Sequence, residues 1–78
     1  MPNNLIYHIT VYKNPTDYPG MYVARRFNIC RDGPVPTDEV FTNKRITSVR
    51  KWIKDNYPDH FRLDRMPGDD PKIYEVWV

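Results

Sequence analysis

The chain has 78 residues, of which 40% are hydrophobic and 14% aromatic, enough for one small domain with a modest core. Its apolar runs are too short for a membrane span, and its first residues lack the basic start and apolar stretch of a secretion signal. The single cysteine, Cys30, excludes an internal disulfide. We therefore expect one cytoplasmic domain over residues 1–78, with no membrane partner.

The charge is distributed unevenly along the chain, although the net charge is only +2. Residues 1–54 hold nine Lys/Arg and four Asp/Glu, whereas residues 55–78 hold three and six. The two parts therefore carry net charges of +5 and −3. This pattern predicts a charge dipole rather than a uniformly basic protein.

Two strands are predicted in the first part of the chain. Residues 5–12 alternate between apolar and more polar side chains, and residues 21–31 are also rich in strand-forming residues. Prolines and a Pro-Gly pair in residues 13–20 indicate a connection between them. Arg25 interrupts the apolar side of the second strand and so indicates a strand end, a bulge or a partner carboxylate. The expected core side of the first strand is Leu5, Tyr7, Ile9 and Val11.

Residues 32–39 are rich in turn-forming residues and predict another connection. Val40 and Phe41 then form a short extra strand or pack beneath the helix that follows. We expect all the prolines of the chain to lie near its start or in connections, outside the helix and the strands.

Residues 43–57 have the only clear helical period in the chain. Thr42 or Asn43 is the expected N-cap, with Thr47 as a later alternative. Lys44 and Arg45 would then occupy the first turn, where the helix dipole disfavours cations. Pro58 ends the helix. The expected core face is Ile46, Val49, Ile53 and Tyr57, with Trp52 beside it.

The last part of the chain predicts a hairpin. Residues 60–66 alternate weakly, residues 67–71 form a turn, and residues 72–78 form a strand that pairs with 61–66. The expected order is ββ(β)αββ. The predicted fold is thus an α+β domain, in which one helix packs on one face of a small antiparallel sheet of about four strands.

Candidate catalytic residues are few. His8, Cys30 and His60 are far apart in the sequence, so they have no metal-ligand spacing. A thiolate at Cys30, activated by Arg31 or His8, is the best enzyme candidate, but a small packing residue on a strand explains Cys30 better. We therefore predict a protein that is not an enzyme, with no catalytic residue, no metal and no cofactor.

Basic and aromatic residues provide the candidate binding site. Several cations lie on or near the predicted helix, and with Arg25, Arg26 and Arg31 they would form a phosphate-binding patch. Exposed aromatics such as Tyr12, Tyr22 or Trp77 would stack on bases. The alternative is an ordinary solvated helix face. The candidate binding residues are Arg26, Lys44, Arg45, Arg50, Lys51, Lys54 and Trp77.

A protein partner is the leading hypothesis, and nucleic acid is the alternative. One helix covers one side of a sheet, and apolar residues such as Ile6, Tyr12, Ile73 and Trp77 should leave some apolar surface exposed on the other. Such a surface binds a partner or a second copy of the chain. The other interpretation is that residues 13–20 and 32–41 fold over that side.

Three segments, MYVARRFNI, PVPTDEVFT and GDDPKIYEVWV, resemble those of short uncharacterised bacterial and prophage-type proteins. Those proteins share a YVVRR-like strand and a C-terminal DDPxIxEVW-type strand, and the resemblance covers residues 19–78. It implies no catalytic residue; it implies a small phage-type protein that binds and blocks a host protein. Our hypothesis is therefore a non-enzymatic protein-binding module, a phage-type modulator or inhibitor of a host protein, with a basic nucleic-acid-binding module as the alternative.

Overall fold

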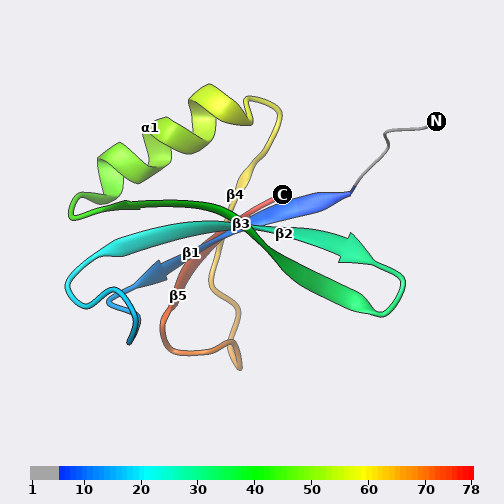
Figure 1. Cartoon of the computed structure of the whole chain (residues 1–78), viewed down its shortest axis with the longest axis horizontal. Coiled ribbons are helices and arrows are strands. Elements are labelled where there is room, and N and C mark those ends of the chain that lie inside the picture. Colours follow the sequence, from blue (N-terminus) through cyan, green and yellow to red (C-terminus); the bar gives the residue numbers. More distant parts are fainter. Residues whose placement is uncertain (1–5) are drawn as a thin grey trace.

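A computed structural model describes residues 6–78 as a five-stranded antiparallel sheet with one helix packed on one face (Figure 1). The predicted α+β class is confirmed, and the third strand is a full member of the sheet. The strands lie in the spatial order β3-β2-β1-β5-β4. In chain order the elements are β1 (Tyr7–Lys13), β2 (Tyr22–Cys30), β3 (Gly33–Asn43), α1 (Ile46–Asn56), β4 (Arg62–Asp64) and β5 (Ile73–Trp77).

The first strand, β1, is the centre of the sheet because it pairs with β2 on one side and β5 on the other. Ile9 and Val11 lie on its helix-facing side and are fully buried. The predicted core side of this strand is therefore confirmed for the described residues, while Leu5 lies outside them. The alternation of the strand produces this result, since residues two apart point to the same face.

The helix packs its apolar face on the sheet as predicted. Val49 and Ile53 are fully buried, and the whole expected set takes part in one core. Among residues 6–78, no helix combines the length and the apolar character that a membrane crossing needs. The core consists of Ile9, Val11, Ala24, Val49, Ile53, Tyr57 and Trp77, with Tyr7, Tyr22, Phe41, Ile46 and Trp52 packed against it.

The start of the helix differs from the prediction. Its N-cap is Arg45, which makes no side-chain cap hydrogen bond. Asn43 still belongs to β3, and its Oδ1 accepts a hydrogen bond from the Arg45 amide at 2.9 Å. Lys44 and Arg45 consequently precede the helix instead of occupying its first turn. The prediction failed because β3 continues to Asn43, so the chain must first turn away from the sheet.

The third strand, β3, begins seven residues earlier than the Val40-Phe41 pair that we expected, at Gly33. Only Arg31 and Asp32 form the connection to β2, and Gly33 follows with a φ of +120°, which favours glycine. The prolines at positions 34 and 36 thus lie in a strand, contrary to the prediction. They are tolerated because β3 is an edge strand, on which some backbone amides have no partner strand to bond.

A β-bulge in β3 explains the position of Arg25. The β2–β3 register shifts between Arg25 and Phe27, so β3 holds extra residues at this point. Thr37 stabilises the bulge: its hydroxyl donates to the Arg26 carbonyl at 2.8 Å, and its carbonyl accepts from Arg25 Nη1 at 2.7 Å. Of the three alternatives for Arg25, the bulge is the one that the structure contains.

A second irregularity lies in β5, which forms the predicted hairpin with β4. Val11 pairs with Glu75 and Tyr12 pairs with Ile73, so Tyr74 is an extra residue. Tyr74 contacts the Tyr22 ring at 5.3 Å between centroids, and Glu75 bonds to the helix. Regular alternation would place Tyr74 and Glu75 on opposite sides of the strand, but here a bulge turns both toward the helix side.

Truncating the core where the helix meets the sheet should destabilise the protein strongly. Ile53→Ala is expected to lower the free energy of unfolding by about 2–5 kcal/mol, because Ile53 is fully buried and a cavity would remain. Chemical denaturation measures the change. The neighbouring exposed control, Lys54→Ala, should change it by less than about 0.5 kcal/mol; a similar loss in both variants would contradict this description of the core.

Candidate functional site

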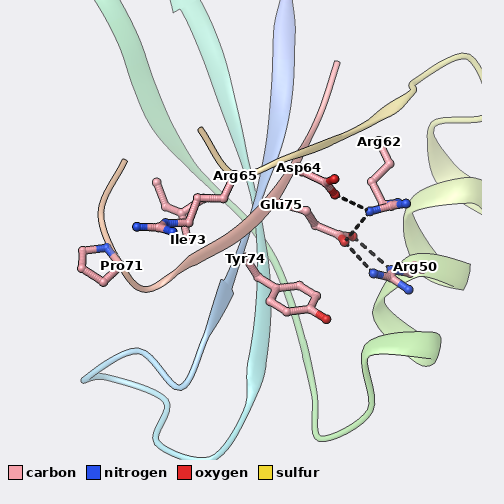
Figure 2. A pocket seen from close by; sticks show the side chains of 8 residues that line it. All are labelled: Arg50, Arg62, Asp64, Arg65, Pro71, Ile73, Tyr74 and Glu75. Carbon is pink, nitrogen blue, oxygen red and sulfur yellow. Dashed lines mark hydrogen bonds and ion pairs between the residues drawn. The ribbon is translucent and has the colours of Figure 1, made fainter. Parts of the chain in front are cut away.

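A buried carboxylate on β5 connects the sheet to the helix. Glu75 on β5 is only 1% exposed, and Arg50 on α1 holds it through two hydrogen bonds, from Nη2 to Oε1 at 2.8 Å and from Nε to Oε2 at 3.2 Å. Trp77 Nε1 donates to the same Oε2 at 2.8 Å. Figure 2 shows Arg50 reaching from the helix to this carboxylate.

The position of Glu75 is stable only because its charge is fully compensated. A carboxylate removed from water needs both an opposite charge and hydrogen-bond donors. Arg50 supplies the charge, and the hydrogen bond to Glu75 in turn raises the pKa of the Arg50 guanidinium. No buried side-chain nitrogen or oxygen among the described residues lacks a hydrogen-bond partner. Glu75 therefore has a structural role that fixes α1 against β5.

Arg62 on β4 extends this cluster toward the sheet edge. Its Nη1 lies 2.8 Å from Asp64 Oδ1 and 3.7 Å from Glu75 Oε1 (Figure 2). A surface hollow of about 430 Å³ lies beside these groups, where the helix does not cover the sheet. Its lining combines cations, carboxylates and an aromatic ring, which suits binding of a polar group. The hollow is lined by Arg50, Arg62, Asp64, Arg65, Pro71, Ile73, Tyr74 and Glu75.

Part of the predicted basic surface comes together beside the helix. Arg50, Lys51 and Lys54 line a second hollow, of about 470 Å³, together with Thr47 and Asp55. However, Arg50 is bound to Glu75, and Lys51 Nζ pairs with Asp55 Oδ2 at 2.7 Å. This surface is therefore less cationic than the sequence suggests.

The remaining predicted cations lie elsewhere. Lys44 and Arg45 are exposed and precede the helix. Arg26 on β2 stacks on the Tyr7 ring, with its guanidinium carbon 3.9 Å from the ring centroid, and lies 3.6 Å from Glu39. Arg26 thus has its own partners and does not line either hollow.

Trp77 is not the exposed aromatic that we expected. It is 4% exposed, because β5 lies between β1 and β4 and places Trp77 opposite Ile9, beneath the helix. Its indole N–H reaches Glu75, so the polar edge of the ring is satisfied inside the protein. The prediction failed because nothing in the sequence shows that the last strand inserts next to the central one.

The sheet face opposite the helix carries a group of exposed apolar side chains, which we call the open-face patch. The strand registers place them on this face: Ile29 pairs with Ile6, Phe61 pairs with Val78, and Leu63 pairs with Val76. Trp77 points to the helix side, so its neighbours on β5 point away from it. The patch comprises Ile6 (69% exposed), Ile29 (37%), Phe61 (75%), Leu63 (51%) and Val78 (48%).

One end of this face is covered and the other is not. In the connection after β1, Pro15 is buried and lies near Val23, which is 3% exposed. The interpretation that residues 13–20 fold over the sheet therefore holds for this end. Residues 32–41 do not cover the face, since most of them form β3. The uncovered end is the one that carries the open-face patch.

A histidine lies on the same face. The His8 ring packs against Phe27 at a tilt, with 5.3 Å between ring centroids and 32° between ring planes. Partial burial lowers the pKa of His8 because its charged form loses hydration. A partner that covered the face would bury His8 further and would thus favour its neutral form.

The other candidate chemistry gains no support from the geometry. Cys30 is exposed at the end of β2. Over residues 6–78, no group of three or more His, Cys, Asp or Glu side chains is placed to hold a metal ion.

Comparison with known proteins does not add a family: no family model, curated protein or solved structure matches the chain. The function is therefore argued from the two hollows and the open-face patch. Of these, sequence reasoning anticipated an exposed apolar face but named only Ile6 of its members. For Phe61 and Leu63, the sequence indicated only that they belong to a strand with weak alternation.

The ion pair beneath the helix should matter more than its neighbour on the surface. Arg50→Met is expected to lower the free energy of unfolding by about 3 kcal/mol, because it leaves the Glu75 carboxylate buried without its main counter-charge. Lys51→Met removes only the exposed pair with Asp55 and should cost less than about 0.5 kcal/mol. Denaturant unfolding compares the two; equal effects would show that Glu75 does not depend on Arg50.

Proposed function

We propose that this protein is a small protein-binding module whose partner docks on the open-face patch. The observation that carries the proposal is the set of apolar side chains left uncovered on the sheet face opposite the helix. Single exposed apolar residues are normal on protein surfaces, but a contiguous group that spans several strands marks an interaction site.

The chemistry of the patch favours a protein partner. Its members are aliphatic or aromatic and present no dense row of cations to a phosphate backbone. Covering apolar surface contributes roughly 25 cal/mol per Å², so a partner gains affinity by burying these side chains. His8 and Arg25, which lie on the same face, provide polar contacts at its edge. A host protein blocked by a phage-type modulator is the partner class that the sequence resemblance implies.

A site-directed crosslinking experiment tests the proposal. A photoreactive amino acid placed at Ile6, which is 69% exposed on the patch, should capture a defined protein from the native host, whereas the same probe at Lys54 on the helix should not. Excess unlabelled wild-type chain should compete for the captured protein. An excess of the Ile29→Ser/Phe61→Ser variant should fail to compete; equal competition by both would remove the patch as the binding surface.

The same double variant yields a prediction that needs no partner. Ile29→Ser/Phe61→Ser should bind an apolar fluorescent dye several-fold less than the wild type does, because both side chains are exposed on the patch. Its free energy of unfolding should change by only about 1 kcal/mol, since neither residue belongs to the core. Fluorescence titration and denaturation measure the two quantities. Unchanged dye binding would show that the patch is not the main exposed apolar surface.

A second function is favoured by one specific observation, the three helix cations around one hollow. If the helix face binds nucleic acid, Lys51→Ala/Lys54→Ala should weaken binding to a DNA or RNA oligonucleotide at low salt, and affinity should fall as salt rises. The charge-matched control is Lys13→Ala/Lys72→Ala, which also removes two exposed cations but leaves the helix unchanged. No binding of the wild type at low salt would exclude this alternative.

A further inference from the structure

The two edges of the sheet differ in their ability to accept another strand. One edge is β3, where Pro34 and Pro36 have no amide hydrogen to donate. A proline nitrogen cannot donate a hydrogen bond to β2, so the backbone nitrogens of these two prolines point outward. The outer edge of β3 therefore lacks N–H donors at both positions. The other edge is β4, which contains no proline. A further strand can therefore pair with β4 more readily than with β3.

The backbone hydrogen bonds of Phe61, the residue before β4, show which groups of β4 face outward. The amide of Phe61 donates to the Val78 carbonyl at 2.7 Å, and the amide of Val78 donates to the Phe61 carbonyl at 2.9 Å. In an antiparallel ladder, alternate residues bond to the same neighbour. The N–H and C=O groups of Arg62 and Asp64 therefore point away from β5, toward a potential partner strand.

The side chains of these two residues have opposite charges and lie symmetrically about Leu63. Arg62 pairs with Trp77 and Asp64 pairs with Glu75, so both point to the helix side of the sheet. If a second β4 runs antiparallel with a twofold axis at Leu63, Arg62 faces the second copy's Asp64, and Asp64 faces the second copy's Arg62. In this register, the outward N–H and C=O groups of Arg62 face those of the second copy's Asp64, and the reverse holds for Asp64. Each of these two residue pairs then exchanges two hydrogen bonds.

The opposite side of the same strand is apolar. Phe61 is 75% exposed and Leu63 is 51% exposed, and both belong to the open-face patch. In the register described, Leu63 meets the second copy's Leu63 in a pair without backbone hydrogen bonds, where side chains approach most closely. The twofold axis is perpendicular to the sheet, so both patches lie on one side of a continuous sheet.

We propose that the chain forms a symmetric dimer by antiparallel pairing of β4 with β4 of a second copy, centred on Leu63. Short, charged edge strands usually discourage pairing, because like charges meet. Here the charges are opposite in sign and the strand is complementary to itself, which selects a second copy over an unrelated strand. The inference goes beyond the proposed function: it uses the sheet edge, and the purified chain alone tests it.

Two charge reversals and their mixture test the register. Arg62→Asp makes both positions acidic, and Asp64→Arg makes both basic, so each variant alone should be monomeric by sedimentation at concentrations where the wild type dimerises. Mixed in equal amounts, they should form a heterodimer, because every cross-strand pair is again opposite in charge. The Arg–Asp contact within one chain cannot produce this result. Arg45→Asp, a reversal away from β4, should leave the wild-type dimer unchanged.

Three outcomes would overturn the proposal. These are a wild type that stays monomeric at millimolar concentration, single variants that dimerise as well as the wild type, and a mixture of folded variants that stays monomeric. Circular dichroism shows whether each variant is folded, which matters because Arg62 lies 3.7 Å from the buried Glu75.

The wild type provides a measurement that needs no variant. In a mixture of isotope-labelled and unlabelled chains, isotope-filtered NMR should detect contacts between the Leu63 side chains of different copies. The amides of Arg62 and Asp64 should exchange with solvent several-fold more slowly as the chain concentration rises. Dimerisation without these signals would place the interface elsewhere and would overturn the β4 register.

Discussion

The ion pair between Glu75 and Arg50 is the interaction that holds the helix to the far half of the sheet. Helix α1 packs mainly over β2 and β3, whereas Glu75 lies on β5, next to the edge strand. A carboxylate that is 1% exposed needs an opposite charge and hydrogen-bond donors beside it, because a buried charge without compensation costs several kcal/mol. The Arg50 guanidinium and the Trp77 indole supply this compensation, and the Arg50 bond thereby holds α1 against β5.

The β-bulge at Tyr74 makes this arrangement possible. It turns Tyr74 toward the helix side next to Glu75, so the wall of the hollow beside Arg62 and the buried carboxylate come from consecutive residues. A regular strand would place one of them on the open face. The bulge therefore determines both how the helix is anchored and where a polar hollow forms.

A sheet with a single helix has one face without a cover, and this chain only partly compensates. The connection after β1 packs Pro15 near Val23 at one end of the open face. At the other end, Phe61, Leu63 and Val78 remain exposed. Because exposed apolar surface is unfavourable in water, this end of the face is the observation that supports the proposed partner.

The sequence by itself determined the fold class, the helix core face and the core side of the first strand. Residues such as Ile9 and Ile53 follow simple periods, and burial of one face enforces those periods. The helix start, the length of β3 and the burial of Trp77 were decided only by tertiary structure. An edge strand tolerates prolines that local rules exclude, and the neighbours of the last strand depend on pairing between residues far apart in the chain. For the same reason, the Glu75–Arg50 pair and the open-face patch, which join elements distant in sequence, could not be read from local pattern.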